Sequence, residues 1–258
     1  WESIVMEEDS LVIGIDIGTG GVRVLAATLM GEVVATANAD IEVSGSKLAL
    51  GWHEQNAEFW WVSVTACLSK VVDCLGDKVG AVAALAVDAT SGTVVCLDDV
   101  GSPVRPALMY NDSRSELEAQ ELCEVAAEHC DRHGYRFTSS FGAAKIMWLI
   151  RNEPDTVTRT RWFCHQADFI VGRLTGELGI TDYSNALKTG YDLFNRCWPP
   201  WIDTFGNIRD RLPKVISPGE RVGELSSAAV SRFGLPNRLV VVAGATDGTA
   251  GFLASGAH

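Results

Sequence analysis

A glycine-rich turn beside an acid, from Asp16 to Gly21, is the first stretch whose residues could do chemistry. Two common phosphate-binding motifs, the dinucleotide fingerprint and the P-loop, both need a helix after the turn, but here β-branched residues follow. The third glycine of the dinucleotide fingerprint is missing, and so is the GKS or GKT of the P-loop. A hairpin tip of this kind can direct backbone N–H groups at phosphate oxygens. A carboxylate beside phosphate needs an intervening cation, so Asp16 predicts Mg²⁺, held directly or through water. The alternative is an ordinary hairpin with a solvated acid. The expected phosphate contacts are Gly18, Thr19, Gly20 and Gly21.

A second acid, Asp247, stands where a buried strand should end and a helix begin, in the run Gly-Ala-Thr-Asp-Gly-Thr-Ala-Gly. A carboxylate in this position is often only a helix N-cap. However, its small neighbours would let a ligand approach the backbone. Open α/β sheets also place their clefts at the carboxyl ends of strands. Asp247 is therefore a candidate general base that accepts a hydroxyl proton.

Two polar turns follow expected strands and suit a ligand rich in hydroxyl groups. In the first, a buried strand ends at Asp88 and short hydroxyl side chains surround a glycine; in the second, an amide and a carboxylate follow Tyr110. Ordinary Asx and Ser turns, or a capped helix start, would give the same patterns. The candidate sugar contacts are Ser91, Gly92, Thr93, Asn111 and Asp112, together with Asp247.

Cysteine and histidine residues gather in one further segment, Cys123, His129, Cys130 and His133. The two cysteines are seven residues apart and so share a helical face. The spacing does not match a usual zinc finger. Two interpretations stay open for this cluster: buried small thiols or a zinc site.

The elements that must position these residues alternate between strands and helices, an α/β order. Asn56 is the expected N-cap of the first helix, with an apolar core stripe of Phe59, Val62, Ala66, Leu68 and Val72. The expected strands are at 12–17, 22–29, 33–43, 80–88, 93–97, 107–110 and 238–243, the first three forming a meander. The expected helices are at 55–75, 113–129, 143–152 (closed by Pro154), 165–174, 226–233 and after Asp247. The helical residues 113–190 suggest an insertion or subdomain.

Composition excludes several classes of protein. The chain has 258 residues, 47% of them hydrophobic and 21% charged, as in globular domains. A net charge of -12 and a pI near 4.8 argue against nucleic-acid binding. No apolar run is expected to reach the length of a membrane helix, and the acidic start is not a signal peptide. Seven cysteines without a CxxC indicate a reducing compartment.

Six motifs in order resemble the FGGY family of carbohydrate kinases, sugar kinases with an actin-like ATPase fold. They are GIDIGTGGVR, GWHEQNAEFWW, ALAVDATSGT, ALMYNDSRS, LTGELGITDYSNALKTGYD and AGATDGTAGFLASGA, and the similarity spans about 11–258. The resemblance implies a mixed sheet flanked by helices in a sugar-binding N-terminal domain. It also implies ATP and Mg²⁺ as cofactors, Asp16 as the magnesium-associated acid and Asp247 as the general base. Ser91 and its neighbours, with Asn111 and Asp112, match positions that hold the ketose. Trp52 belongs to a segment near the sugar, where a packing role is the alternative.

The closest branch implied is the xylulose-kinase-like D-ribulose kinases of cyanobacteria and plants. Many relatives carry Ser or Thr at the position of Gly20. Xylulose kinases usually have Gln-Met-His-Gly where this chain has Thr90 to Thr93, which favours D-ribulose over D-xylulose. The implied reaction phosphorylates D-ribulose to D-ribulose 5-phosphate. The expected compartment is the cytoplasm, with the plastid stroma as the alternative. The expected enzyme is a monomer or homodimer that binds neither nucleic acid nor membrane.

The family's C-terminal ATP-binding domain is expected to follow the last motif, where this chain stops. The fragment alone is therefore expected to be inactive, and the alternatives are a sugar-binding or regulatory module or a heat-shock-type ATPase lobe.

Overall fold

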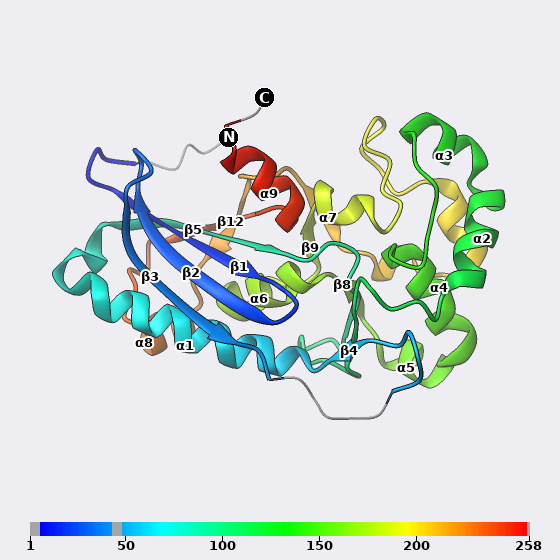
Figure 1. The fold of residues 1–258 in the computed structure, drawn as a ribbon, viewed down its shortest axis with the longest axis horizontal. Helices are drawn as coiled ribbons and strands as arrows, with labels where there is room; N and C mark the ends of the chain where they lie inside the picture. Colours follow the sequence, from blue (N-terminus) through cyan, green and yellow to red (C-terminus); the bar gives the residue numbers. More distant parts are fainter. Residues whose placement is uncertain (1–5, 43–47, 257–258) are drawn as a thin grey trace.

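The computed structural model of the protein describes residues 6–42 and 48–256. Its centre is a mixed six-stranded sheet with the strand order β11-β12-β5-β1-β2-β3 (Figure 1). The antiparallel strands β1 (Leu11–Ile17), β2 (Gly21–Thr28) and β3 (Val33–Asp40) form the predicted meander. The predicted end of the third strand, at Val43, lies outside the described residues.

Parallel pairing brings the carboxyl ends of three strands to one edge of the sheet. β5 (Val82–Ala89) runs parallel both to β1 and to β12 (Val240–Val242), and β11 (Arg221–Glu224) pairs antiparallel with β12. Side chains alternate along β1, so that its isoleucines are buried on one face and Asp16 lies half-exposed on the other. The edge at which β1, β5 and β12 end is where an open α/β sheet forms its ligand site.

Three helices pack together on one face of the sheet, α1 (Ala57–Leu75), α6 (Gln166–Thr175) and α8 (Ser227–Phe233) (Figure 1). Their ends confirm the sequence predictions. The Asn56 side chain accepts a hydrogen bond from the Glu58 amide at 3.0 Å. Gly176 and Gly234 follow α6 and α8 in the left-handed conformation, which glycine adopts without a steric penalty.

The buried face of α1 differs from the predicted stripe. Leu68 is buried, but Val62 is 61% exposed, and Trp60 and Val64 fill the core instead. The helix is apolar on most sides, so the sequence pattern does not select the buried face. With the 3₁₀ turn η1 (Gly76–Ala81), it forms a 25-residue stretch long and apolar enough to cross a membrane, contrary to expectation. Because α1 packs along β2 and β3, the role of core helix accounts for its composition.

The predicted helix at 113–129 is two helices, α2 (Glu116–Val125) and α3 (Ala127–His133), separated at Ala126. α4 (Gly142–Asn152) is confirmed. Pro154 does not only close α4; it is the first residue of α5 (Pro154–Arg159), a position that tolerates proline because its N–H has no helical partner. These four helices lie beside the sheet, whereas α6 packs on it, so the predicted insertion at 113–190 contains one helix of the main core.

Several short elements were not predicted or are shorter than predicted. Three two-stranded sheets pair β4 (Glu54–Gln55) with β7 (Ala107–Leu108), β6 (Val95–Leu97) with β8 (Trp162–Cys164), and β9 (Ile180–Asp182) with β10 (Lys214–Ile216). The remaining helical elements are α7 (Tyr183–Leu187), the 3₁₀ turns η2 (Pro200–Phe205) and η3 (Arg209–Arg211), and α9 (Asp247–Ala254).

Candidate active site

Three aspartates meet at the edge where β1, β5 and β12 end. Asp16 on β1 is paired in register with Asp88 on β5, and Asp247 is the first residue of α9, which follows β12. Since β5 lies between β1 and β12, Asp88 stands between the two acids singled out from the sequence. Its carboxyl group hydrogen-bonds that of Asp16 and is close enough to Asp247 to be affected by its charge. The sequence predicts Asp88 at the end of a strand, but no sequence signal placed it among the candidate site residues.

Burial and the two neighbouring acids change the protonation of Asp88. Burial, the Asp16 charge, the hydrogen bond to Asp16 and the Asp247 charge together raise the pKa of Asp88 to about 7. Asp88 is therefore about half protonated near neutral pH. Arg23, across the hairpin on β2, donates from Nη1 to Asp16 Oδ2 at 3.0 Å, and its side chain is 78% exposed. A set of carboxylate oxygens with excess negative charge is the donor chemistry that Mg²⁺ prefers, so these residues fit the predicted ion.

The hairpin tip predicted to bind phosphate is a tight, externally braced turn. The Gly18 amide donates to the Gly21 carbonyl at 2.9 Å. Gln55 donates to the Thr19 carbonyl at 2.7 Å and in turn accepts from the indole of Trp60 at 2.7 Å. A polar cavity of about 480 Å³ adjoins the turn, lined by residues 18–23 and 38–40. The core helix α1 thus fixes the position of the turn.

Asp247 is exposed at the start of α9 and is not its N-cap. The cap is Thr246, whose hydroxyl accepts from the Thr249 amide at 3.4 Å. Asp247 accepts only a local hydrogen bond, from the Gly248 amide at 2.7 Å, among the described contacts. The Thr246 amide donates to the Ser184 hydroxyl at 3.0 Å, which ties α9 to α7. The Asp247 carboxylate is consequently held near Asp88 with an oxygen available to a ligand.

The predicted sugar contacts divide into two groups. The Ser91 and Asn111 side chains make no hydrogen bond recorded in the described part of the chain, and both reach solvent. Thr93 is fully buried, and its hydroxyl accepts from the Tyr110 amide at 3.2 Å. Gly92 is buried with a φ of +80°, and a Cβ there would lie 2.1 Å from the Ser140 carbonyl oxygen. The structure thus offers Ser91 and Asn111 as ligand donors, and Gly92 and Thr93 shape the turn that presents Ser91.

Asp112 is completely buried and its oxygens are already occupied. They accept from the His53 amide at 2.7 Å and from Arg114, whose Nε and Nη2 bind both oxygens at 2.9 and 2.8 Å. The Arg114 guanidinium lies 3.8 Å from the ring centre of Trp52. Asp112 and Trp52 therefore hold Arg114 and the segment before α2, and a direct sugar contact by Asp112 stays a prediction.

Lys188, directly after α7, was missed by the sequence analysis. Its ammonium group lies 4.3 Å from the ring centre of Phe141, and its Cβ is 3.8 Å from where a Cβ at Gly92 would be. Burial lowers the pKa of Lys188. Within residues 6–42 and 48–256 no acid forms an ion pair with it. A half-buried cation without an acidic partner, beside the Ser91 turn, is suited to an oxygen-rich ligand.

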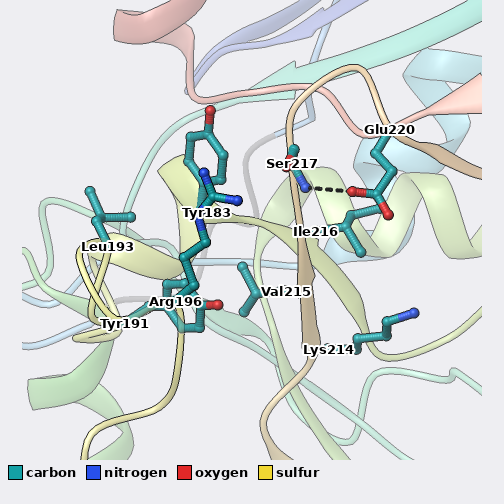
Figure 2. A pocket seen from close by; sticks show the side chains of 9 residues that line it. All are labelled: Tyr183, Tyr191, Leu193, Arg196, Lys214, Val215, Ile216, Ser217 and Glu220. Atoms are coloured by element: carbon teal, nitrogen blue, oxygen red, sulfur yellow. Dashed lines mark hydrogen bonds between the residues drawn. The ribbon is translucent and has the colours of Figure 1, made fainter. Parts of the chain in front are cut away.

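A cavity of about 360 Å³ opens next to α7 and β10 (Figure 2). Tyr183, the first residue of α7, lines it, and the neighbouring Ser184 is the residue that binds Thr246. On its other wall the Ser217 amide donates to the Glu220 carboxylate at 3.1 Å (Figure 2). The lining residues are Tyr183, Tyr191, Leu193, Arg196, Lys214, Val215, Ile216, Ser217 and Glu220. None of the three clustered aspartates lines this cavity, which is therefore distinct from the acidic site.

Comparison with known proteins gives one family match. Residues 11–254 match the model of the FGGY family of carbohydrate kinases, N-terminal domain. Among curated proteins, a xylulose kinase of Lactococcus lactis is 29% identical over 255 residues, covering 95% of this chain and 49% of the relative. A xylulose kinase of Streptomyces coelicolor is 31% identical over 265 residues, covering 96% and 51%.

Solved structures agree with the observed fold. The xylulose kinase of Rhodospirillum rubrum superimposes with a TM-score of 0.87 at 29% identity, covering 95% of this chain and 51% of that one. A structure from Brucella ovis described as a xyloylose kinase gives a TM-score of 0.86 at 26% identity, covering 93% and 49%. The chain thus spans about half the length of the relatives it matches.

Proposed function

The chain belongs to the FGGY family of carbohydrate kinases, through its N-terminal domain, and we propose that its protein transfers a phosphoryl group from ATP to a ketopentose hydroxyl. The observation that carries this proposal is the meeting of Asp16, Asp88 and Asp247 at one sheet edge, beside a braced glycine turn. A sheet edge with three acids would repel a triphosphate unless a cation lay between the carboxylates and the phosphates. The same arrangement leaves one acid, Asp247, exposed to an acceptor.

The roles of the chain's own residues follow from their positions. Asp16, with Asp88 beside it, would hold Mg²⁺, which offsets phosphate charge during transfer. The backbone amides from Thr19 to Gly21 would bind phosphate oxygens, whereas the predicted contact by Gly18 is not available because its amide closes the turn on the Gly21 carbonyl. Gln55 keeps that turn in place. Asp247 accepts the proton of the attacking hydroxyl. Most of the rate then comes from positioning and electrostatic stabilisation, as in other phosphoryl transfers.

The acceptor is an open-chain ketopentose held by Ser91, Asn111 and Lys188. The names of the similar proteins favour xylulose. D-Ribulose is the second candidate because Thr90 to Thr93 replaces the Gln-Met-His-Gly run expected of xylulose kinases. Both sugars present vicinal hydroxyls to the same donors, so the site chemistry accommodates either.

A panel of pentuloses tests the proposal. Calorimetry on this chain measures sugar binding, and ADP formation in the protein that contains the chain measures turnover. We expect one ketopentose to bind and to be turned over only with Mg-ATP. Binding without turnover would favour a sugar-binding module, and the absence of binding to every pentulose would overturn the acceptor assignment.

A further inference from the structure

Two histidines and an aspartate come together in a buried cluster unconnected with the acidic site. His129 and His133 are four residues apart on α3 and so lie on the same face of that helix. Asp192 comes from the loop that follows α7. One ligand atom from each of the three lies within 4.8 Å of the others. Two imidazoles and a carboxylate form a ligand set typical of divalent transition metals.

The tautomer of His133 is set in the way that metal ligands require. Its Nδ1 donates to the His129 carbonyl at 3.0 Å, which leaves the Nε2 lone pair facing Asp192. The distance from Nε2 to Asp192 Oδ1 is 3.5 Å, and the two side chains are only 3% and 5% exposed. Two ligands of one tetrahedral zinc ion, each about 2.0 Å from it, lie about 3.3 Å apart. The observed pair is therefore already near the spacing of a bound state.

The surroundings of the other two ligands agree with this assignment. His129 Nε2 lies 2.8 Å from the Tyr135 hydroxyl, and an ion bound at this nitrogen would replace that hydrogen bond. Asp192 accepts from the amides of Phe194 and Asn195, at 2.9 Å each, which orients the carboxylate. Such supporting hydrogen bonds are usual for a ligating carboxylate. The Leu193 amide donates to His133 Nε2 at 3.2 Å, and a bound ion would displace this hydrogen bond as well.

The two cysteines of the same sequence segment do not join the cluster. Cys123 donates to the Phe137 carbonyl at 3.4 Å, and Cys130 is buried in the apolar cluster that Cys123 packs against. An entry path exists on the other side, because a cavity of about 550 Å³ is lined by His129, Asp192 and Cys197. Arg132, 3.3 Å from Asp192 Oδ2, is 51% exposed and can move into solvent.

We propose that His129, His133 and Asp192 bind one zinc-type divalent metal ion that joins α3 to the loop after α7. The fourth position is open to water from the cavity. The ion has a structural role, because it would fix the loop that begins directly beyond Lys188 and Gly190. This proposal is independent of the kinase assignment, since none of its ligands belongs to the acidic site.

Titration of the 258-residue chain with Zn²⁺ and Co²⁺ tests the proposal. Calorimetry should give one equivalent of bound Zn²⁺, and bound Co²⁺ should show visible absorption bands of a four-coordinate ion. X-ray absorption of the zinc form should show nitrogen and oxygen ligands only. At about one hundred times the dissociation constant, Zn²⁺ should raise Tm by about 5 °C.

Matched variants locate the ion. His133→Gln and Asp192→Asn should each weaken Zn²⁺ binding by at least about tenfold. His53→Gln, which changes an exposed histidine elsewhere, and the double variant Cys123→Ser/Cys130→Ser should leave it unchanged. Sulfur in the zinc shell, loss of binding only in the cysteine variant, or no stoichiometric binding by the wild-type chain would each overturn the proposal. The spectroscopic result decides the matter even where a variant fails to fold.

Discussion

At the scale of single residues, the protonation of Asp88 depends on where the fold places its side chain. The sequence places it at the end of a buried strand, which predicts little more than a polar turn. Only the register of β5 against β1 puts its carboxyl group beside that of Asp16. A pairing between strands that are some seventy residues apart cannot be read from local patterns, which is why the third acid of the site was not predicted.

The raised pKa of Asp88 predicts how stability depends on pH in the metal-free chain. The pKa rises from 3.8 to about 7 on folding, so the folded state favours protonated Asp88. Its contribution to stability is fully present below about pH 4 and is lost as the pH rises through 7. Asp88→Asn has no carboxyl group to ionise, so its stability does not fall in this pH range for this reason. In urea unfolding with EDTA, the variant should gain stability over the wild type between pH 4 and pH 8.

The control for that measurement is Asp99→Asn, which changes an exposed acid in a distant turn and should follow the wild-type pH profile. Parallel profiles for Asp88→Asn and the wild type would mean that the pKa of Asp88 is not raised on folding.

Lys188 gives a second prediction at this scale. Lys188→Met keeps the apolar stem over Phe141 but removes the charge. If the ammonium binds the sugar, its loss should raise KM for the pentulose about tenfold or more, because a hydrogen bond to a charged group is removed. KM for ATP should not change. Lys188→Arg should restore part of the sugar affinity, whereas equal rises in both KM values would point to a general loss of structure.

At the scale of elements, the long regular ones were predictable and the short ones were not. Strong alternation and an Asn56 cap located β1, β2 and α1 within about one or two residues. β9 and β10 have three residues each and form because they pair with one another. Strands this short show no alternation of apolar and polar residues from which they could be predicted. The helix at 113–129 divides at Ala126 although its residues favour a continuous helix, since tertiary packing outweighs intrinsic propensity.

The glycines of the site yield a prediction that separates packing from ligand binding. A Cβ at Gly244 would lie 1.9 Å from the Val87 carbonyl oxygen, so this residue lets β12 and β5 approach rather than a ligand. A Cβ at Gly20 meets nothing within 4 Å. Gly244→Ala should therefore destabilise the chain by about 3 kcal/mol or more, and Gly20→Ser should change stability by less than about 0.5 kcal/mol. Denaturant unfolding measures both.

Gly92→Ala belongs to the same series, because its positive φ and the nearby Ser140 carbonyl both oppose a side chain. It should be destabilising like Gly244→Ala. If Gly20→Ser proved as costly as the other two, the hairpin tip would be more tightly enclosed than the structure has it.

At the scale of the whole molecule, the fold explains why residues from both ends of the chain form one site. β1, near the start of the sequence, and β12, near its end, flank β5, and parallel pairing aligns their carboxyl ends. The order of motifs in the sequence predicted the fold, and it singled out Asp16 and Asp247, which the structure places at the same sheet edge. Substrate identity could not be predicted in this way, because the candidate sugar contacts Ser91, Asn111 and Lys188 come from three separate segments whose relative placement only the structure supplies.

The central claim is that Asp247 accepts the proton of the sugar hydroxyl. The most direct test is the rate of ADP formation by Asp247→Asn in the protein that contains this chain, with pentulose affinity measured on the same variant. The account predicts that kcat falls by about 10³-fold or more, while the pentulose dissociation constant stays within about threefold of the wild-type value. A variant that retains wild-type kcat with the sugar bound normally would contradict it.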